Sequence, residues 1–289
     1  MKQNGTSKNE VRTEFFKNLG ISKSLITLPS IGLGCVKEFA KQGVTTDRSH
    51  QQWVERNQDS FHKLAKIAGN RKTITVHRGD IEDYVPNRPV DLLNADLESG
   101  FTRRFGIALE TRLAPCLMED AKALLWFTWS RNAQSSDFYK HFVGICDRSN
   151  PGLLCDLKNK ISKELSTRDH RTITYLVMLR CALNRYSFHI RRAQHYQDGM
   201  GMIAIRIENI RKSVDAPVYP SFTSIAAGFE NKRIRANYAS NELLIINQKL
   251  ATVGMDIKYT ETGYDLYQDG VIAEHLNGLA SIQRLVDRL

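Results

Sequence analysis

The sequence predicts an α/β fold in which a mainly parallel sheet ends in an antiparallel hairpin and is flanked by helices. Four short apolar runs between Ser24 and Glu98 each end in a turn that carries small or acidic residues. Helical patterns separate these runs, and a fifth, almost wholly apolar run follows them. Strands that alternate with helices in this way form parallel sheets, which bind ligands beyond the carboxyl ends of their strands.

The first half of the chain predicts four strands and four helices. The helices are expected from the spacing of apolar residues, with Gly20 and Gly43 as stops and Ser49 as the N-cap of the third. The predicted strands are Leu25–Leu28, Val44–Thr46, Thr73–Val76 and Val90–Leu93. The predicted helices are Val11–Leu19, Cys35–Gln42, His50–Ala68 and Thr102–Met118, the last bent at Pro115.

The next part of the chain predicts the centre and the far edge of the sheet. Ala123–Trp129 has the apolar composition of a strand that is buried on both faces. Thr172–Leu183 has a helical pattern. Tyr186–Ala193 and Met202–Ile207 read as two strands joined by a glycine-containing hairpin loop.

The domain organisation predicted from these patterns has two parts. The main α/β domain covers residues 1–212, with its core at about 20–212. Residues 213–240, which contain Pro217 and Pro220, are expected to be a linker. Residues 241–289 are expected to form a small α+β unit. That unit has helices at Asn241–Val253 and Asn277–Leu289, strands at Met255–Thr260 and Tyr264–Gln268, and a candidate third strand at Val271–His275.

Positive charge is concentrated in one part of the sequence, which indicates what the chain could bind. The net charge is +10, and residues 171–240 hold 11 Lys and Arg against 4 Asp and Glu, interleaved with aromatic residues. Such a stretch can hold a nucleic-acid backbone and stack bases, and it can equally be a solvated surface over core aromatics. The candidate nucleic-acid contacts are Arg131, Arg185, Arg191, Arg192, Lys232, Arg233 and Arg235.

Other features of the composition favour a cytoplasmic protein. No run approaches the roughly 20 apolar residues of a membrane span, and the polar N-terminus does not resemble a secretory signal. The five cysteines are widely spaced without a CxxC pair, which favours reduced thiols and gives no zinc-site spacing. We expect no metal and no membrane partner.

The order of elements from Ser24 to Ile207 resembles the class I S-adenosylmethionine-dependent methyltransferase domain, a Rossmann-like fold. That family has seven strands, five of them parallel, and ends in a hairpin whose last strand inserts antiparallel. The resemblance covers about two-thirds of the chain and rests on element order and strand-end residues. It implies S-adenosylmethionine (SAM) as the cofactor and methyl transfer as the activity.

The resemblance also assigns roles to residues at the strand ends. The glycine loop after strand 1 would be Ile31-Gly32-Leu33-Gly34, with Gly32 and Gly34 allowing close approach of the backbone to the cofactor. Ser30, just before this loop, is also a candidate cofactor contact. Asp47, next to Arg48, would bind the ribose hydroxyls, and Asp80, next to Ile81, the adenine amino group. The segment facing the transferred methyl would supply the candidate catalytic residues Asn94, Asp96 and Glu98.

The sequence departs from the family at two places. Thr27-Leu28-Pro29-Ser30 lacks the acid that usually precedes the glycine loop. The segment after strand 4 has neither the Asn-Pro-Pro-Tyr type sequence of amino-methylating enzymes nor a cysteine nucleophile. Separately, Lys37 stands where a dinucleotide fingerprint needs its third glycine, which argues against a nicotinamide-dependent enzyme. Each acid also has a plainer reading, as a helix N-cap or a solvated loop charge.

Three hypotheses follow from the sequence. The first is a SAM-dependent methyltransferase that acts on nucleic acid, in which Asp96 positions or deprotonates the acceptor. The alternative is a non-catalytic nucleic-acid-binding protein on a degenerate methyltransferase scaffold. The third is a methyltransferase for a small molecule.

Overall fold

The computed structural model describes most of the main domain and the strands of a small C-terminal unit. The described residues are 8–29, 31–97, 99–129, 138, 142, 144, 170–198, 200–213, 220–230, 246, 250, 255–259, 264–268 and 271–276. The chain divides into two compact units, residues 1–226 and residues 227–289. None of the described helices is long and apolar enough to cross a membrane.

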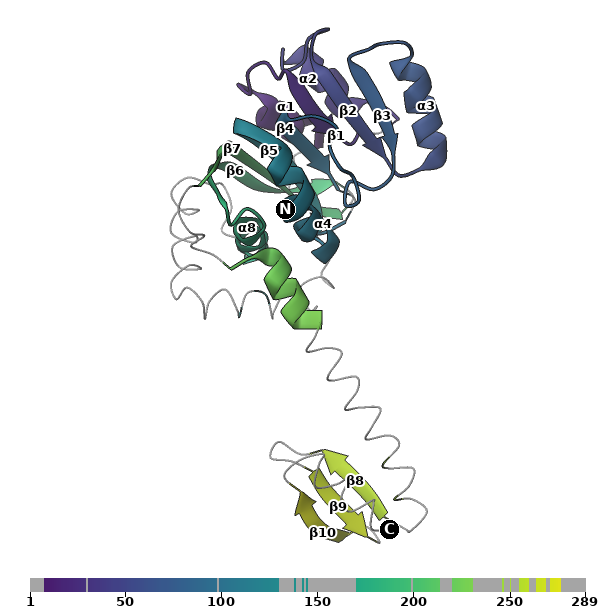
Figure 1. The fold of residues 1–289 in the computed structure, drawn as a ribbon, viewed down its shortest axis with the longest axis vertical. Helices are drawn as coiled ribbons and strands as arrows, with labels where there is room; N and C mark the ends of the chain where they lie inside the picture. The colour runs from purple at the N-terminus through teal and green to yellow at the C-terminus, as the bar shows by residue number, and fades with distance from the viewer. Residues whose placement is uncertain are drawn as a thin grey trace, which may run out of the picture. The chain divides into compact units, whose positions relative to one another are not determined.

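The first unit contains a seven-stranded sheet with the order β3-β2-β1-β4-β5-β7-β6 (Figure 1). The pairs within β3-β2-β1-β4-β5 are parallel, and β7 inserts antiparallel between β5 and β6. The strands are β1 (Ser24–Thr27), β2 (His50–Glu55), β3 (Ile74–Arg78), β4 (Val90–Asp96), β5 (Leu117–Trp129), β6 (Tyr186–Asp198) and β7 (Met200–Lys212). This arrangement confirms the methyltransferase-like α/β fold predicted from the sequence.

Helices cover both faces of the sheet. On one face, α1 (Lys8–Phe16) and α2 (Gly34–Lys41) pack Phe15, Phe16 and Phe39 against β4 and β5. Next to α2, α3 (Gln58–Ala68) packs on Trp53 of β2. On the other face, α4 (Arg103–Ala108) and α8 (His170–Ala182) join the largest hydrophobic cluster. The sheet is therefore buried on both sides, as its apolar central strand predicts.

The second strand is not where the sequence predicts it. Residues 44–46 lie in a loop, and the strand is His50–Glu55, inside the segment predicted to be the start of a helix. Ser49 does not cap a helix, because its hydroxyl donates to the backbone oxygen of Ser22 at 2.6 Å and holds the loop against the start of β1. The helix begins later, at Gln58, where the Asn57 side chain accepts from the Ser60 backbone N–H.

Residues 222–230 form a helix inside the stretch predicted to be a linker, so that prediction is wrong for these residues. Phe222 is fully buried and its ring lies 4.8 Å from that of Phe142. The Glu110 carboxylate fixes the start of this helix, because it accepts hydrogen bonds from the Thr223 backbone N–H and from the Ser221 hydroxyl, both at 2.7 Å. Pro217 and Pro220 gave the sequence a loop-like composition that hid this packing.

The remaining elements of the first unit follow the predictions with shifted ends. The helix predicted to bend at Pro115 consists of α4, a π-helical turn at Leu109–Leu113 and a 3-10 turn at Ala114–Cys116. Strand β5 starts at Leu117 rather than at Ala123. Strands β6 and β7 are each 13 residues long, so the hairpin is longer than predicted.

The second unit contains a three-stranded antiparallel sheet with the order β10-β9-β8. Its strands are β8 (Met255–Tyr259), β9 (Tyr264–Gln268) and β10 (Val271–Leu276), which confirms all three predicted strands. Ile246 and Leu250 are helical and bury their side chains with Ile257, Leu266 and Leu276. The remainder of the two helices predicted here lies outside the described residues.

Candidate ligand-binding site at the carboxyl ends of the strands

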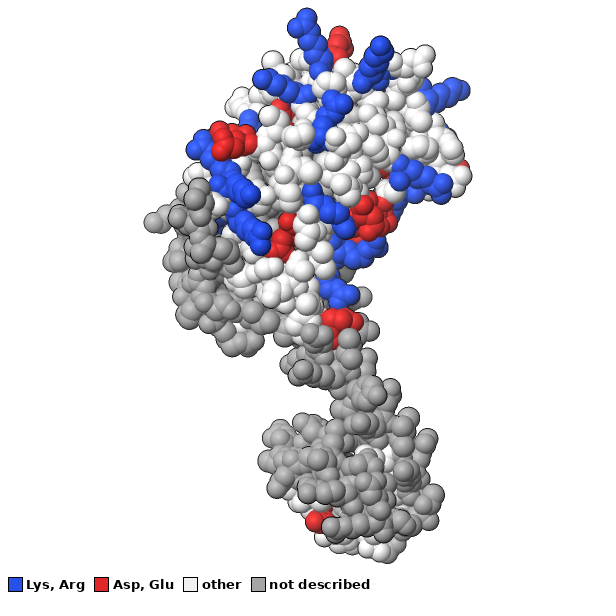
Figure 2. Space-filling model, viewed as in Figure 1, with Lys and Arg blue, Asp and Glu red and all other residues white. Residues whose placement is uncertain are grey.

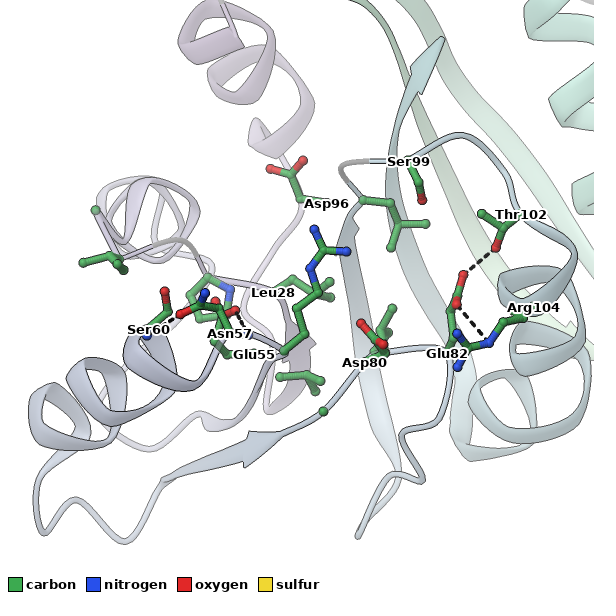
Figure 3. Close-up of a pocket in the computed structure, with 18 of the residues that line it drawn as sticks. Leu28, Glu55, Asn57, Ser60, Asp80, Glu82, Asp96, Ser99, Thr102 and Arg104 are labelled. Carbon is green, nitrogen blue, oxygen red and sulfur yellow. Dashed lines mark hydrogen bonds and ion pairs between the residues drawn. The ribbon is translucent and has the colours of Figure 1, made fainter. Parts of the chain in front are cut away.

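A cavity of about 1040 Å³ lies at the carboxyl ends of β1 to β4 (Figure 3). It opens where the strand order reverses, between β1 and β4, which is where open α/β sheets bind ligands. Four strand-end segments and the start of α1 line it. The lining residues include Lys8, Arg12, Leu28, Pro29, Ile31, Gly32, Val54, Glu55, Asp80, Ile81, Asp96 and Leu97.

Glu55 is the acid at the carboxyl end of β2. One of its carboxylate oxygens accepts the backbone N–H of Asn57 at 2.8 Å, which orients the side chain at the turn into α3. The second oxygen makes no hydrogen bond with a residue that the structure describes. Glu55 therefore has a free acceptor in a fixed position on the cavity wall.

Asp80 is the acid that follows β3, as the sequence predicts. The turn is tight, because Gly79 adopts a φ of 147° and the Asp80 backbone oxygen accepts from Asp83. The next residue, Ile81, is 4% exposed and belongs to the main hydrophobic cluster. Asp80 and Ile81 both line the cavity, so a polar acceptor and an apolar surface lie side by side there.

Asp96, at the end of β4, lies in the cavity wall and is held by two cations from α1. Its Oδ2 lies 2.9 Å from Arg12 Nη2 and 3.2 Å from Lys8 Nζ. The Arg12 and Asp96 side chains are each 12% exposed, so this ion pair is largely desolvated. These two contacts fix the position of the Asp96 carboxylate in the cavity wall.

Asn94 does not reach the cavity. It is fully buried, where its Nδ2 donates to Thr27 Oγ1 at 2.9 Å and its Oδ1 accepts from Trp126 Nε1 at 2.8 Å. The side chain therefore links β1, β4 and β5 inside the sheet. The prediction of Asn94 as a catalytic residue placed it at the end of strand 4, but the strand continues to Asp96.

The glycine loop after β1 has two different roles. Gly32 lines the cavity, where Ile31 and Pro29 accompany it. Gly34 starts α2, and a Cβ on it would lie 2.8 Å from Arg12 Nη1. Gly34 therefore makes room for the guanidinium rather than for a ligand. Ser30 lies outside the described residues.

Asp47 and Arg48, the pair predicted to bind the ribose, do not line the cavity. Asp47 and Arg48 are exposed in a turn that precedes β2, at its amino end. This follows from the misplaced second strand, and Glu55 occupies the strand-end position that was assigned to Asp47. Glu98, the remaining predicted site residue of the β4 segment, lies outside the described residues.

Two groups of site residues were missed by the sequence reasoning. The alternation in His50–Glu55, with Trp53 and Val54 before the acid, was read as part of a helix. A helix start at Asn57 would have revealed Glu55. No local signal identifies Lys8 and Arg12, because their role depends on the packing of α1 across the end of β4.

The basic residues predicted to contact nucleic acid are only partly described. Arg185 and Arg191 are exposed. Arg192 pairs with Glu14 of α1 at 3.1 Å and lies over the Phe15 ring. Figure 2 shows Lys and Arg side chains across the viewed face of the first unit, with Asp and Glu among them. Arg131, Lys232, Arg233 and Arg235 lie outside the described residues.

Comparison with known proteins gives structural similarity without sequence similarity. No protein-family model and no curated protein sequence matches the chain. The structure is similar to that of N-methyltransferase NodS from Bradyrhizobium japonicum WM9, with 8% identity, a TM-score of 0.45, and coverage of 71% of this chain and 95% of that one.

Two further solved structures show the same kind of similarity. TrmN from Thermus thermophilus has 9% identity and a TM-score of 0.41, with coverage of 70% of this chain and 48% of that one. TYW2 from P. horikoshii in complex with MeSAdo has 11% identity and a TM-score of 0.41, with coverage of 72% and 65%. At these identities and scores, nothing about function follows. The strand order of the chain itself shows a divergent class I methyltransferase fold.

Proposed function

We propose that the cavity binds SAM and that the chain transfers its methyl group. The observation that carries this proposal is the pair of acids at the ends of neighbouring strands, Glu55 on β2 and Asp80 after β3, which line one cavity beside Gly32. Two carboxylate acceptors suit the hydroxyls of a ribose and the amino group of an adenine.

The described residues fit a nucleoside-sized ligand. The cavity volume of about 1040 Å³ is slightly above the range of about 300–1,000 Å³ for small-molecule sites, so a nucleoside with a side chain has room in it. Val54, Ile81 and Leu97 supply apolar surface for a base between the acids. Bound SAM would supply an electrophilic methyl sulfonium, and the residues of the cavity would act by orienting it toward an acceptor and by excluding water.

The role of Asp96 changes in this proposal. Because Arg12 and Lys8 hold its Oδ2 in place, we assign Asp96 to positioning a charged group of the ligand. Catalysis then rests mainly on proximity and alignment, which suits an acceptor that is nucleophilic without a strong base.

Calorimetric titration with S-adenosylhomocysteine (SAH), the product of transfer, tests the cofactor site. We expect micromolar binding by the wild type. Glu55→Ala and Asp80→Ala each remove acceptors worth about 1.5–3 kcal/mol, so each should weaken binding about tenfold to a hundredfold. Asp47→Ala is the matched control and should bind as the wild type does. Failure of a folded wild type to bind SAH, or loss of binding only in Asp47→Ala, would overturn the assignment.

For the acceptor, we propose nucleic acid. The net charge of +10 and the exposed Arg185 and Arg191 on and beside β6 support this choice. Transfer of a labelled methyl group from SAM to total RNA, total DNA and a small-metabolite extract tests it. Labelling of RNA or DNA, weakened by rising salt, supports the proposal, whereas labelling of the small-metabolite fraction alone would favour a small-molecule methyltransferase.

A second candidate is a nucleic-acid-binding protein without methyltransferase activity. Its favouring observations are the missing acid after β1 and the ion pairs that engage Asp96 with Arg12 and Lys8. Salt-dependent binding of nucleic acid by a folded protein that does not bind SAM or SAH would establish this candidate.

A further inference from the structure

The crevice between β1 and β4 contains a charged group that the family pattern does not predict. The Arg12 guanidinium reaches across it from α1. One of its nitrogens lies against Gly34, where a Cβ would be 2.8 Å away, and another lies 2.9 Å from Asp96 Oδ2. The guanidinium therefore bridges the loop after β1 and the end of β4, in the wall of the cavity.

The end of β1 offers no carboxylate of its own. Leu28 and Pro29 line the cavity there, and Pro29 also lacks a backbone N–H. A ligand with an ammonium group would find no acid at this strand end. Asp96, at the end of the neighbouring strand β4, supplies a carboxylate on the other side of the crevice.

Arg12 and Asp96 each keep a polar atom that is available to a ligand. Arg12 Nη2 donates to Asp96 Oδ2 at 2.9 Å, while Arg12 Nη1 and Asp96 Oδ1 make no hydrogen bond with a residue that the structure describes. A donor and an acceptor therefore lie close together in the cavity wall. This arrangement is complementary to a zwitterion, with a ligand carboxylate on the guanidinium and a ligand ammonium on Oδ1.

We propose that Arg12 and Asp96 bind the amino-acid end of SAM and replace the acid that is missing after β1. Arg12 takes the carboxylate and Asp96 takes the ammonium. This inference rests on the proposed function, because it requires the adenosyl part to lie between Glu55 and Asp80. If the Arg12–Asp96 ion pair only held α1 against the sheet, ligands with and without the charged groups of the amino-acid end would not be distinguished by these two residues.

Ligands that differ only at that end test the inference. Calorimetry compares SAM with decarboxylated SAM, which keeps the ammonium, and SAH with 5′-methylthioadenosine, which has neither charged group. We expect the wild type to bind decarboxylated SAM about tenfold or more weakly than SAM, because decarboxylated SAM lacks the carboxylate that would form charge-assisted hydrogen bonds with Arg12. Equal affinity for SAM and decarboxylated SAM would overturn the inference and leave the proposed function standing.

Variants of Arg12 test whether this residue causes the difference in affinity between SAM and decarboxylated SAM. Arg12→Gln should bring the ratio of affinities for SAM and decarboxylated SAM close to one, and Arg12→Lys should restore part of it. Glu14→Gln is the control, because it removes an exposed charge from the same helix outside the cavity. An unchanged ratio in Arg12→Gln would contradict the assignment.

Gly34→Ala provides a second route if Arg12→Gln does not fold. Its added Cβ meets only the end of the flexible Arg12 side chain, so every charge stays while the guanidinium must move. We expect the ratio of affinities for SAM and decarboxylated SAM to fall, while the affinity for 5′-methylthioadenosine stays unchanged. A ratio equal to that of the wild type would count against the inference. Absence of binding for every ligand in the wild type would instead remove the proposed function and this inference with it.

Discussion

Replacement of Asn94 by alanine separates a buried structural residue from a catalytic one. Asn94 is fully buried and makes two side-chain hydrogen bonds, at 2.9 Å to Thr27 and at 2.8 Å from Trp126. In Asn94→Ala the Trp126 Nε1–H is left without its acceptor in a site that is 1% exposed. An unsatisfied buried group costs about 1–3 kcal/mol, and the small cavity adds to this cost.

We therefore expect Asn94→Ala to lower the free energy of unfolding by about 3 kcal/mol. For a unit of this size, that loss corresponds to a fall of about 6–12 °C in the melting temperature. Urea unfolding, followed by tryptophan fluorescence and circular dichroism, measures it. Asn87→Ala makes the same chemical change at an exposed position and should alter stability by less than about 0.5 kcal/mol.

SAH affinity, measured under conditions where the variant is folded, completes the test. Asn94 does not line the cavity, so Asn94→Ala should bind SAH as the wild type does. A variant with wild-type stability and lost SAH binding would make Asn94 a site residue, as its position at the end of predicted strand 4 first indicated, and would contradict a purely structural role.

Two other predictions concern the packing and the pH dependence of the first unit. Phe222→Ala removes a fully buried ring that packs on Phe142 and on Gly106, and should cost about 3–5 kcal/mol in a urea titration; a cost below about 1 kcal/mol would mean that helix 222–230 does not pack as described. Burial lowers the pKa of His77, and its Nε2 has no hydrogen-bond partner among the described residues. Protonation therefore favours the unfolded chain, so stability should be full above the unfolded pKa of about 6.5 and should fall as the pH drops below it. His77→Gln should flatten this fall between pH 7.5 and pH 5.5, and an unchanged pH profile would contradict the assignment.

The parts of the fold that the sequence predicted correctly are those with a strong local pattern. The apolar run at Ala123–Trp129 has the composition of a buried central strand, and the two segments on either side of Gly199 have the pattern of hairpin strands. Asp80 was placed correctly because the apolar run before it is short and ends in a glycine turn. In these places, local pattern and tertiary packing agree.

The second strand shows where local pattern is insufficient. His50–Glu55 begins with polar residues, and its strand identity comes from pairing with β1 on one side and β3 on the other. The apolar Trp53 and Val54 also fit the helical spacing that continues to Ala68, so a helix explained the segment equally well. The error moved the expected ribose contact from Glu55 to Asp47.

The site itself depends on contacts that connect distant parts of the chain. Along β4, Asn94 and Asp96 point to the same face because side chains alternate along a strand. Asn94 accepts a hydrogen bond from Trp126 inside the sheet. Asp96 lies two residues farther along β4, where it pairs with Arg12. Nothing in the sequence near Asp96 indicates this ion pair, since its two residues are 84 positions apart.

A crystal structure of the wild-type protein with SAH would show whether Glu55 and Asp80 hold the cofactor. We expect the ribose hydroxyls to lie within hydrogen-bond distance of the Glu55 carboxylate and the adenine to lie beside Asp80 and Ile81. SAH bound away from these two acids, or soaked crystals that show no SAH in the cavity at saturating concentration, would contradict this expectation.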